Sequence, residues 1–355
     1  MNGLLIYPFC DEFIEFARCK EAMEGYDKLI LVAPKSFGLD GEDASTCDGG
    51  DPLNIIISSD FIGGMEQADA AFFGYVGANI TEQNYIEKIR TVLDHKKKVY
   101  ITKELKEHLG EFDNSGQTEV LENTKEMFME ELTEQLLPIP VPVIMVFGIG
   151  DHCNKFSIQL KLRDYFQSQG YRVMSCGSKS FSKLFGIEAF PQFLFDDMND
   201  GMKIRLFNAY IYHRVKRENP DVVVIGIPGG IMQINPFIFR EFGESAFIIS
   251  NAVKADISVF SLYKQDFTHE FMEKLINLCK YRYNFPISYI NIANTNLNIS
   301  SEDKQEHFTT VSSQHIIEEV LKELHYEDVT FFNALNEDSM REACDKICKE
   351  LENNI

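Results

Sequence analysis

The stretch VIMVFGIGDHCNKFSIQLKLRDYF, residues 143–166, decides the fold of this chain. It begins with a run of apolar residues, which is typical of a strand buried in a parallel sheet. Its second half has the apolar spacing of an amphipathic helix, which Gly170 is expected to close. Between them, residues 148–155 have the outline of a phosphate-binding loop, in which backbone N–H groups and a lysine hold an anion at a helix N-terminus. The stretch therefore predicts an α/β domain with an anion site at one strand end.

The loop departs from the standard pattern G-x-x-x-x-G-K-[ST] at two positions. Gly148 and Lys155 are in place, but Asn154 stands where the second glycine belongs, and Phe156 follows the lysine. Asn adopts the left-handed backbone conformation more readily than other residues with a side chain, and Ser157 supplies a hydroxyl one position late. On the motif alone, a phosphate site and an ordinary strand-to-helix turn with a surface lysine stay open as alternatives.

A second glycine-containing loop is expected beside the first. The segment VVVIGIPGG (222–230) has the shape of the strand-to-loop segment hhhhDTPGG of nucleotide-driven switch proteins, with Gly226 in place of the Asp. Without that carboxylate, Mg²⁺ would be held poorly and hydrolysis would be slow or absent unless another acid substitutes. The candidates for that substitution are Asp151, Asp196 and Asp197. The pair Gly229 and Gly230 permits close approach of a phosphate, and a tight turn explains the pair equally well.

The two loops together define the expected ligand contacts. Lys155 would neutralise phosphates, N–H groups of residues 150–156 would cradle them, and Ser157 would contact Mg²⁺ or a phosphate oxygen. The residues expected to bind the ligand are Gly148, Gly150, Asn154, Lys155, Ser157, Gly229 and Gly230. ATP or GTP with Mg²⁺ fits these contacts. Lys264 and Asp266, where guanine-specific proteins carry N-K-x-D, are either base contacts or solvated charges.

No reaction follows from the sequence, and the candidate catalytic residues lie in the loop itself. His152 is either an acid or base close to a bound phosphate or a solvent-facing residue. We expect the helix N-terminus and Lys155 to lower the pKa of Cys153, which would make it a conceivable nucleophile. Asp151 is the third candidate. No His–Asp pair is placed beside them by the sequence.

Composition excludes several classes of partner. The 34 basic and 55 acidic residues give a net charge of -21, which disfavours binding to nucleic acid and to anionic lipid. No apolar run is long enough to cross a bilayer, and MNGLLIYPFCDEF reads as a first strand and not as a signal peptide, so we expect a cytoplasmic protein. The eight cysteines contain no C-x-x-C pair, which argues against a zinc site and a disulfide framework.

The order of apolar runs and helical stretches predicts two three-layer α/β domains. Residues 1–112 are expected to form a Rossmann-like domain, 113–138 a helical linker, and 139–355 a P-loop NTPase-like domain with a parallel sheet. In the first domain we expect strands at 3–9, 27–34, 53–59, 68–75 and 97–103 and helices at 11–24 and 80–95. The Gly- and Asp-rich segment 35–52 is either a binding loop or a solvated one.

Aromatic residues are abundant, with 29 Phe, 14 Tyr and no Trp. Two clusters, FPQFLF (190–195) and NPFIFREF (235–242), fall in expected loops near the phosphate-binding loop. They are either a surface for a peptide partner or side chains buried beneath the loops.

Two resemblances extend these expectations. GIGDHCNKFSIQLKL (148–162) is similar to the loop G-T-D-x-x-V-G-K-M-T-T of a two-domain P-loop family, where Ser157 matches the first Thr and Asn154 departs from the glycine. One branch of that family acetylates D-glutamate, which implies that such a loop can hold a coenzyme A diphosphate, with acetyl-CoA as the alternative to ATP or GTP. Over most of the chain, stretches such as APKSFGLDGEDAS, NPDVVVIGIPGGIM and FGESAFIISNAVKADISVFSL resemble clostridial peptide-maturation system proteins from biosynthetic clusters for ribosomally made, cysteine-rich peptides.

The second resemblance implies an accessory role in peptide natural-product maturation, with a precursor peptide or a peptide-modifying enzyme as partner. Whether the chain is an enzyme stays open: a P-loop protein with weak or no ATP or GTP hydrolysis is one alternative. A non-catalytic scaffold for the peptide or its modifying enzyme is another, and a coenzyme A-dependent acyltransferase is a third. A homodimer is kept as an alternative to a monomer.

Overall fold

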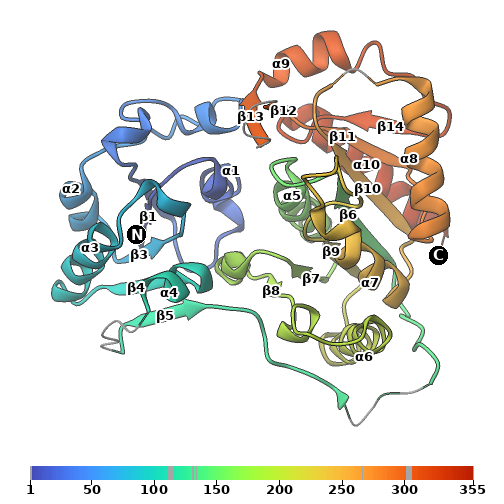
Figure 1. Ribbon diagram of the computed structural model, residues 1–355, viewed down its shortest axis with the longest axis horizontal. Coiled ribbons are helices and arrows are strands. Elements are labelled where there is room, and N and C mark those ends of the chain that lie inside the picture. Colours follow the sequence, from blue (N-terminus) through green and yellow to red (C-terminus); the bar gives the residue numbers. More distant parts are fainter. Residues whose placement is uncertain are drawn as a thin grey trace. The chain divides into compact units, whose positions relative to one another are not determined.

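The structure is a computed structural model that describes residues 2–110, 116–129, 132, 134–265, 267–300 and 306–354. The chain forms two compact α/β units, each built around a parallel sheet flanked by helices (Figure 1), which confirms the expected fold class. The first unit comprises Met1–Asp48, Pro52–Asn123 and Lys179–Ala189. The second comprises Gly49–Asp51, Thr124–Ser178 and Phe190–Ile355.

The sheet of the first unit has the strand order β2-β1-β3-β4-β5, and all its pairs are parallel. Its strands are β1 (Gly3–Tyr7), β2 (Lys28–Leu31), β3 (Ala70–Phe73), β4 (Lys98–Thr102) and β5 (Thr118–Leu121). Its longer helices are α2 (Phe61–Glu66), α3 (Glu82–Asp94) and α4 (Lys103–Leu109). Thr81 and Thr102 cap α3 and α4 by accepting backbone hydrogen bonds, as N-cap residues do.

Three expectations for the first unit are wrong in detail. The helix expected at 11–24 is broken into three short turns, Asp11–Phe13, Glu15–Arg18 and Lys20–Ala22. The strand expected at 53–59 is reduced to isolated bridges. The helical linker expected at 113–138 contains strand β5, and none of its described residues lies in an α-helix. Pairing with β4 overrides the helical spacing of that segment, because β propensity depends on neighbouring strands.

The sheet of the second unit has the strand order β14-β11-β10-β6-β9-β7, again with parallel pairs. Its strands are β6 (Val143–Gly148), β7 (Val173–Gly177), β9 (Val222–Gly226), β10 (Ile257–Leu262), β11 (Tyr289–Ile292) and β14 (Thr330–Phe332). An antiparallel hairpin, β12 (Thr295–Ile299) with β13 (Glu306–Thr310), was not anticipated. The short strand β8 (Glu188–Ala189) ends the Lys179–Ala189 segment.

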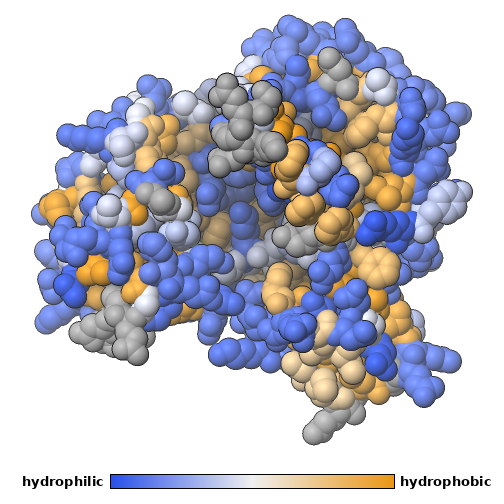
Figure 2. Space-filling view, in the orientation of Figure 1, coloured by the Kyte–Doolittle hydropathy of each residue, from blue (hydrophilic) through white to orange (hydrophobic). Residues whose placement is uncertain are grey.

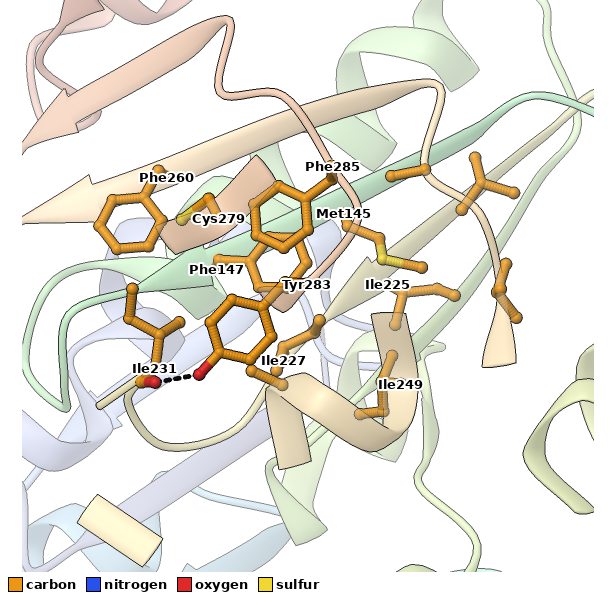
Figure 3. Packing of buried hydrophobic residues seen from close by; sticks show 14 of the residues in the cluster. Met145, Phe147, Ile225, Ile227, Ile231, Ile249, Phe260, Cys279, Tyr283 and Phe285 are labelled. Carbon is orange, nitrogen blue, oxygen red and sulfur yellow. Dashed lines mark hydrogen bonds between the residues drawn. The ribbon is translucent and has the colours of Figure 1, made fainter. Parts of the chain in front are cut away.

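Helices cover both faces of this sheet, and successive side chains of a strand point to opposite faces. The helices are α5 (Lys155–Ser168), α6 (Asp200–Glu218), α7 (Glu244–Ala252), α8 (His269–Arg282) and α10 (Glu337–Asn354), with a short α9 (Ser313–His315). Met145 and Phe147 of β6 pack with α6, α7 and α8, whereas Ile144 and Val146 pack with α5 and α10. This period of two is that of a strand buried on both faces. Figure 3 shows the first cluster, in which the rings of Phe147 and Phe285 stack 3.9 Å apart.

The connections from three neighbouring strands diverge at one edge of this sheet. Strand β6 leads into α5 on one face, whereas its neighbours β9 and β10 lead to α7 and α8 on the other. Loops that leave neighbouring parallel strands toward opposite faces open a crevice at the carboxyl edge, where open α/β sheets bind ligands. The loop after β6 lies at this position.

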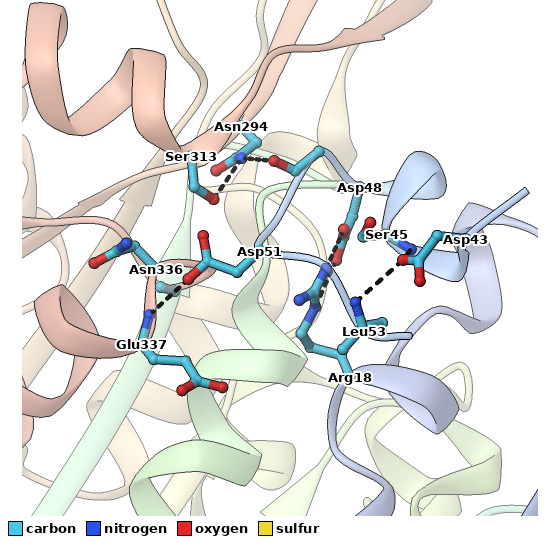
Figure 4. Close-up of polar contacts among 12 residues, drawn as sticks. Arg18, Asp43, Ser45, Asp48, Asp51, Leu53, Asn294, Ser313, Asn336 and Glu337 are labelled. Atoms are coloured by element: carbon cyan, nitrogen blue, oxygen red, sulfur yellow. Dashed lines mark hydrogen bonds and ion pairs between the residues drawn. The ribbon is translucent and has the colours of Figure 1, made fainter. Parts of the chain in front are cut away.

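The acidic loop at 35–52 is held by specific contacts (Figure 4). In the first unit, Arg18 donates to Asp48 at 2.6 Å, and both side chains are buried. In the second unit, Asn294 Nδ2 donates to the carbonyl of Gly49 at 2.8 Å, and the N–H of Glu337 donates to Asp51 Oδ2 at 3.3 Å. These residues are therefore not merely solvated charges.

None of the helices in the described part of the chain has the length and apolar character needed to span a membrane.

Candidate functional site

The loop between β6 and α5 has a backbone that requires small or left-handed residues. Asn154 adopts φ 64° and ψ 17°, the left-handed region, immediately before the first helical residue. A Cβ on Gly148 would lie 2.6 Å from Cys153 Sγ and 2.8 Å from Lys155 Cδ. Asn154 therefore replaces the usual glycine in backbone terms, as its tolerance of this region predicts. Its side chain makes no capping bond, and its Oδ1 is buried without a hydrogen-bond partner.

Lys155 joins this loop to the loop after β9. Its Nζ donates to the carbonyl of Gly150 at 2.7 Å and also to the carbonyl of Gly229. Gly229 has φ +66°, and a Cβ on Gly230 would lie 2.5 Å from the carbonyl oxygen of Ile149. The structure thus brings together the glycines and the lysine that the sequence singled out, around one ammonium group.

The hydroxyl and the acid that a magnesium site needs are less well provided. Ser157 lies in the first turn of α5 and is buried. At the end of β9, the space beside Gly226 is filled by Gln159, because a Cβ there would lie 2.8 Å from Gln159 Cδ. Within the described ranges, no group of three or more His, Cys, Asp or Glu side chains is placed to hold a metal ion. Asp196 and Asp197 are exposed before α6, where Asp196 accepts a hydrogen bond from Gln192.

Of the three candidate catalytic residues, Cys153 is the most altered by its surroundings. It is 1% exposed and donates its S–H to the carbonyl of Gly150 at 3.0 Å. Burial raises the pKa of the Cys153 thiol and outweighs the opposing effect of Lys155. The expectation of a lowered pKa is therefore wrong, because desolvation penalises the thiolate more than the nearby ammonium stabilises it.

Asp151 and His152 lie on the outer side of the loop. Asp151 pairs through Oδ2 with Arg240 Nη1 at 2.6 Å, and its carbonyl accepts a hydrogen bond from the Tyr263 hydroxyl at 2.6 Å. His152 is exposed, with its ring 4.5 Å from that of Phe308 in the β12–β13 hairpin. Both therefore have structural contacts in addition to any chemical role.

Several residues that support the loop were missed from the sequence. Ser261 of β10 donates to the carbonyl of Cys153, and Asn291 Nδ2 of β11 donates to Ser261 Oγ at 2.6 Å. Arg240 lies against Gly150, pairs with Asp151 and Glu306, and donates to the Tyr263 hydroxyl at 3.4 Å. The available signals were isolated polar residues within apolar strands and one arginine inside an aromatic loop. Neither of these sequence features shows which residue the side chain contacts until the fold is known.

The two aromatic clusters predicted at 190–195 and 235–242 differ in their exposure to solvent. Phe190 and Phe193 are buried, so the first aromatic cluster belongs largely to the core. Phe237, Phe239 and Phe242 are 56%, 50% and 52% exposed, and the rings of the last two stack at 5.5 Å. Figure 2 shows apolar side chains among polar ones over this segment between β9 and α7.

The expected guanine contacts gain no support from the described residues. The N–H of Lys264 donates to the carbonyl of Thr295 at 2.8 Å, which fixes the start of the β12–β13 hairpin. Tyr263, which stands where the Asn of that motif belongs, contacts the loop after β6 instead. Asp266 lies outside the described residues.

Comparisons with known proteins identify a shared fold. No protein-family model matches the chain, and no curated protein matches it. The crystal structure of a DUF1611 family protein from Anabaena variabilis has a TM-score of 0.61 at 10% identity, and the match covers 98% of this chain and 100% of that chain. At that identity the likeness shows the fold alone. A nucleotide-binding protein in complex with ADP from Archaeoglobus fulgidus is 16% identical over 59% of this chain and 87% of its own, but its TM-score of 0.34 is too low to support an argument.

Proposed function

We propose that this chain binds a diphosphate-containing ligand through residues 148–157 and serves as an accessory component of a peptide natural-product maturation system. One observation carries the binding proposal: the Lys155 ammonium bridges the carbonyls of Gly150 and Gly229, at the carboxyl edge where the sheet connections diverge. Phosphate oxygens would replace these carbonyls as acceptors. Hydrogen bonds from an ammonium to an anionic oxygen are stronger than bonds to neutral carbonyls, so the exchange is favourable.

The start of α5 adds to the attraction for an anion. The helix has 14 residues, and its first turn contains no acidic side chain that would neutralise the positive end of the helix dipole. The net charge of -21 acts against anions at long range, but salt screens it over about 8 Å at physiological ionic strength. Local N–H groups and Lys155 therefore dominate inside the loop.

The neighbourhood of Gly226 favours binding without rapid hydrolysis. Gln159 fills the position that the magnesium-supporting carboxylate takes in P-loop hydrolases, so the chain's residues do not fit that metal site, and we assign no step to a metal ion. ATP, GTP and coenzyme A share the diphosphate that the loop would hold. Because the loop can hold a diphosphate without a metal ion, acetyl-CoA is the alternative ligand, and acyl transfer would be the corresponding activity.

The exposed aromatic residues support a partner role. Phe237, Phe239 and Phe242 follow Gly229 in the same connection, so a ligand that displaces Lys155 from Gly229 would act on the loop that carries them. Exposed aromatic side chains provide large contact areas with few rotatable bonds, which suits an interface with a precursor peptide or a modifying enzyme. A scaffold that presents this loop would need no catalysis.

Calorimetric titration tests the binding proposal. The purified protein is titrated with ATP, GTP and acetyl-CoA, each with and without Mg²⁺, beside Lys155→Ala and the charge-matched control Lys274→Ala on the exposed side of α8. We expect one ligand to bind to the native protein and to the control but not to Lys155→Ala. Failure of all three ligands to bind, or equal binding by Lys155→Ala, would contradict the proposal and leave the scaffold role.

A further inference from the structure

We propose that Arg240 is a second phosphate-binding cation of this site and that Asp151 competes with the ligand for it. The inference rests on the proposed binding of a diphosphate by residues 148–157. It adds a residue from outside the loop motif and predicts that an acidic side chain within the motif weakens binding. The affinity of the loop for the ligand would then depend on replacing the ion pair between Arg240 and Asp151 with one between Arg240 and a phosphate.

Position is the first support for this role. A Cβ on Gly150 would lie 3.0 Å from Arg240 Nη2, and a Cβ on Gly230 would lie 3.4 Å from Arg240 Cβ. Lys155 Nζ donates to the carbonyl of the same Gly150 at 2.7 Å. The two cationic side chains therefore meet at one glycine of the phosphate-binding loop.

The partners of the guanidinium differ in how easily they can be exchanged. Arg240 Nη1 pairs with Asp151 Oδ2 at 2.6 Å, and the Asp151 side chain is 58% exposed. Arg240 Nη2 pairs with Glu306, whose side chain is 21% exposed. An ion pair with an exposed carboxylate contributes little net free energy because water competes for it. Asp151 is therefore the partner that a phosphate would replace, whereas Glu306 would keep the guanidinium in place.

An unused donor points to an anion. The Arg240 side chain is 9% exposed, and its Nε is buried without a hydrogen-bond partner. A buried donor without a partner is costly and is rare in native proteins. The guanidinium has five N–H donors, so Nη1 and Nε, which lie on different edges of its plane, can each donate to a different oxygen of a diphosphate, whereas a lysine ammonium offers its donors at a single point.

The backbone at Arg240 is held in an uncommon conformation. Its φ is 51°, in the left-handed region that residues with a side chain seldom adopt. Such conformations persist where the surrounding contacts fix them, and they concentrate at binding sites. Here the contacts that fix Arg240 are those with Asp151, Glu306 and Tyr263. Asp151 belongs to the loop after β6, and the Tyr263 hydroxyl donates to the Asp151 carbonyl.

Inorganic pyrophosphate, the group common to the nucleotides and coenzyme A, is the probe for this inference. Titrations without Mg²⁺ compare the native protein with Arg240→Gln, Arg240→Lys, Asp151→Asn and the double variant Arg240→Gln/Asp151→Asn. We expect Arg240→Gln to weaken binding about tenfold or more and Arg240→Lys to recover only part of it. We expect Asp151→Asn to tighten binding roughly threefold to tenfold, and to have no such effect when Arg240 is already replaced.

The outcomes separate this inference from the proposed function. Binding by the native protein that Lys155→Ala abolishes, together with unchanged affinity in Arg240→Gln and Asp151→Asn, would overturn the role of Arg240 and leave the phosphate loop intact. Absence of binding in every form would overturn the proposed function and this inference with it. Near-ultraviolet circular dichroism and the midpoint of thermal unfolding show whether each variant keeps the native packing. An Arg240→Gln variant that fails to fold shifts the decision to Asp151→Asn, whose unchanged affinity would overturn the inference.

Discussion

Gln159 occupies the space beside Gly226 that a side chain at that position would need. A Cβ on Gly226 would lie 2.8 Å from Gln159 Cδ. The Gln159 amide is fixed there, because its Nε2 donates to the carbonyl of Cys176 at 2.7 Å and to that of Val224 at 3.2 Å. One helix residue thus ties together the ends of β7 and β9, and an acid at the end of β9 is excluded by packing.

We expect Gly226→Asp to destabilise the protein by about 2–4 kcal/mol, through overlap with Gln159 and burial of a carboxylate. The free energy of unfolding from urea titration measures this loss. In the double variant Gln159→Ala/Gly226→Asp we expect part of the loss to be recovered, since the overlap is removed. Equal stability of Gly226→Asp and the native protein would show that Gln159 moves aside freely and does not exclude the acid.

Local sequence patterns predict the centre of the second unit but not the contacts that set its chemistry. The strand, loop and helix at 143–166 follow from apolar spacing and glycine, all of which act within a few residues. The contact of Gln159 with Gly226 and the ion pair of Arg240 with Asp151 join residues that are far apart in the sequence. They form only when the sheet brings the helix and the loops together. The misassigned segment around Thr118–Leu121 has the same cause, because its pairing with β4 is not written in its own spacing.

Asn154 provides a test of the left-handed backbone in the loop. Asn154→Gly and Asn154→Ala both remove the buried Oδ1 that has no partner, so the difference between them isolates the backbone. At φ 64°, we expect the Ala variant to be about 1 kcal/mol less stable than the Gly variant. Chemical denaturation of the two proteins measures the difference. Equal stabilities would mean that the loop relaxes to another conformation when Asn154 is replaced.

Cys153 is expected to be unreactive in the native protein. Burial raises the pKa of its thiol, so less of the reactive thiolate forms than in an exposed cysteine at the same pH. We expect iodoacetamide to modify Cys153 at least about 100-fold more slowly in the native protein than in the urea-unfolded chain. Mass spectrometry of the peptide that contains Cys153 follows the rate, and Cys153→Ala identifies the signal. A native rate close to that of the unfolded thiol would restore the residue as a candidate nucleophile.

Glu15 in the first unit makes stability depend on pH. Its carboxyl is buried, its Oε2 has no hydrogen-bond partner, and burial raises its pKa from 4.5 to about 7, although Lys179 acts in the opposite direction. The folded state therefore holds a proton that the unfolded chain releases at lower pH. The resulting contribution to stability is fully present below pH 4.5 and is lost as the pH rises through about 7.

We expect Glu15→Gln to remove this loss, because the amide stays neutral at every pH in the range. Between pH 5 and pH 8, the stability of the variant relative to the native protein should rise by roughly 2.5 kcal/mol, most of the free energy of the pKa shift. Urea unfolding at four pH values measures the two curves, with Glu21→Gln at an exposed position of the neighbouring turn as the matched control. Parallel curves for Glu15→Gln and the native protein would mean that the buried carboxyl is already ionised below pH 5, with its charge stabilised by Lys179.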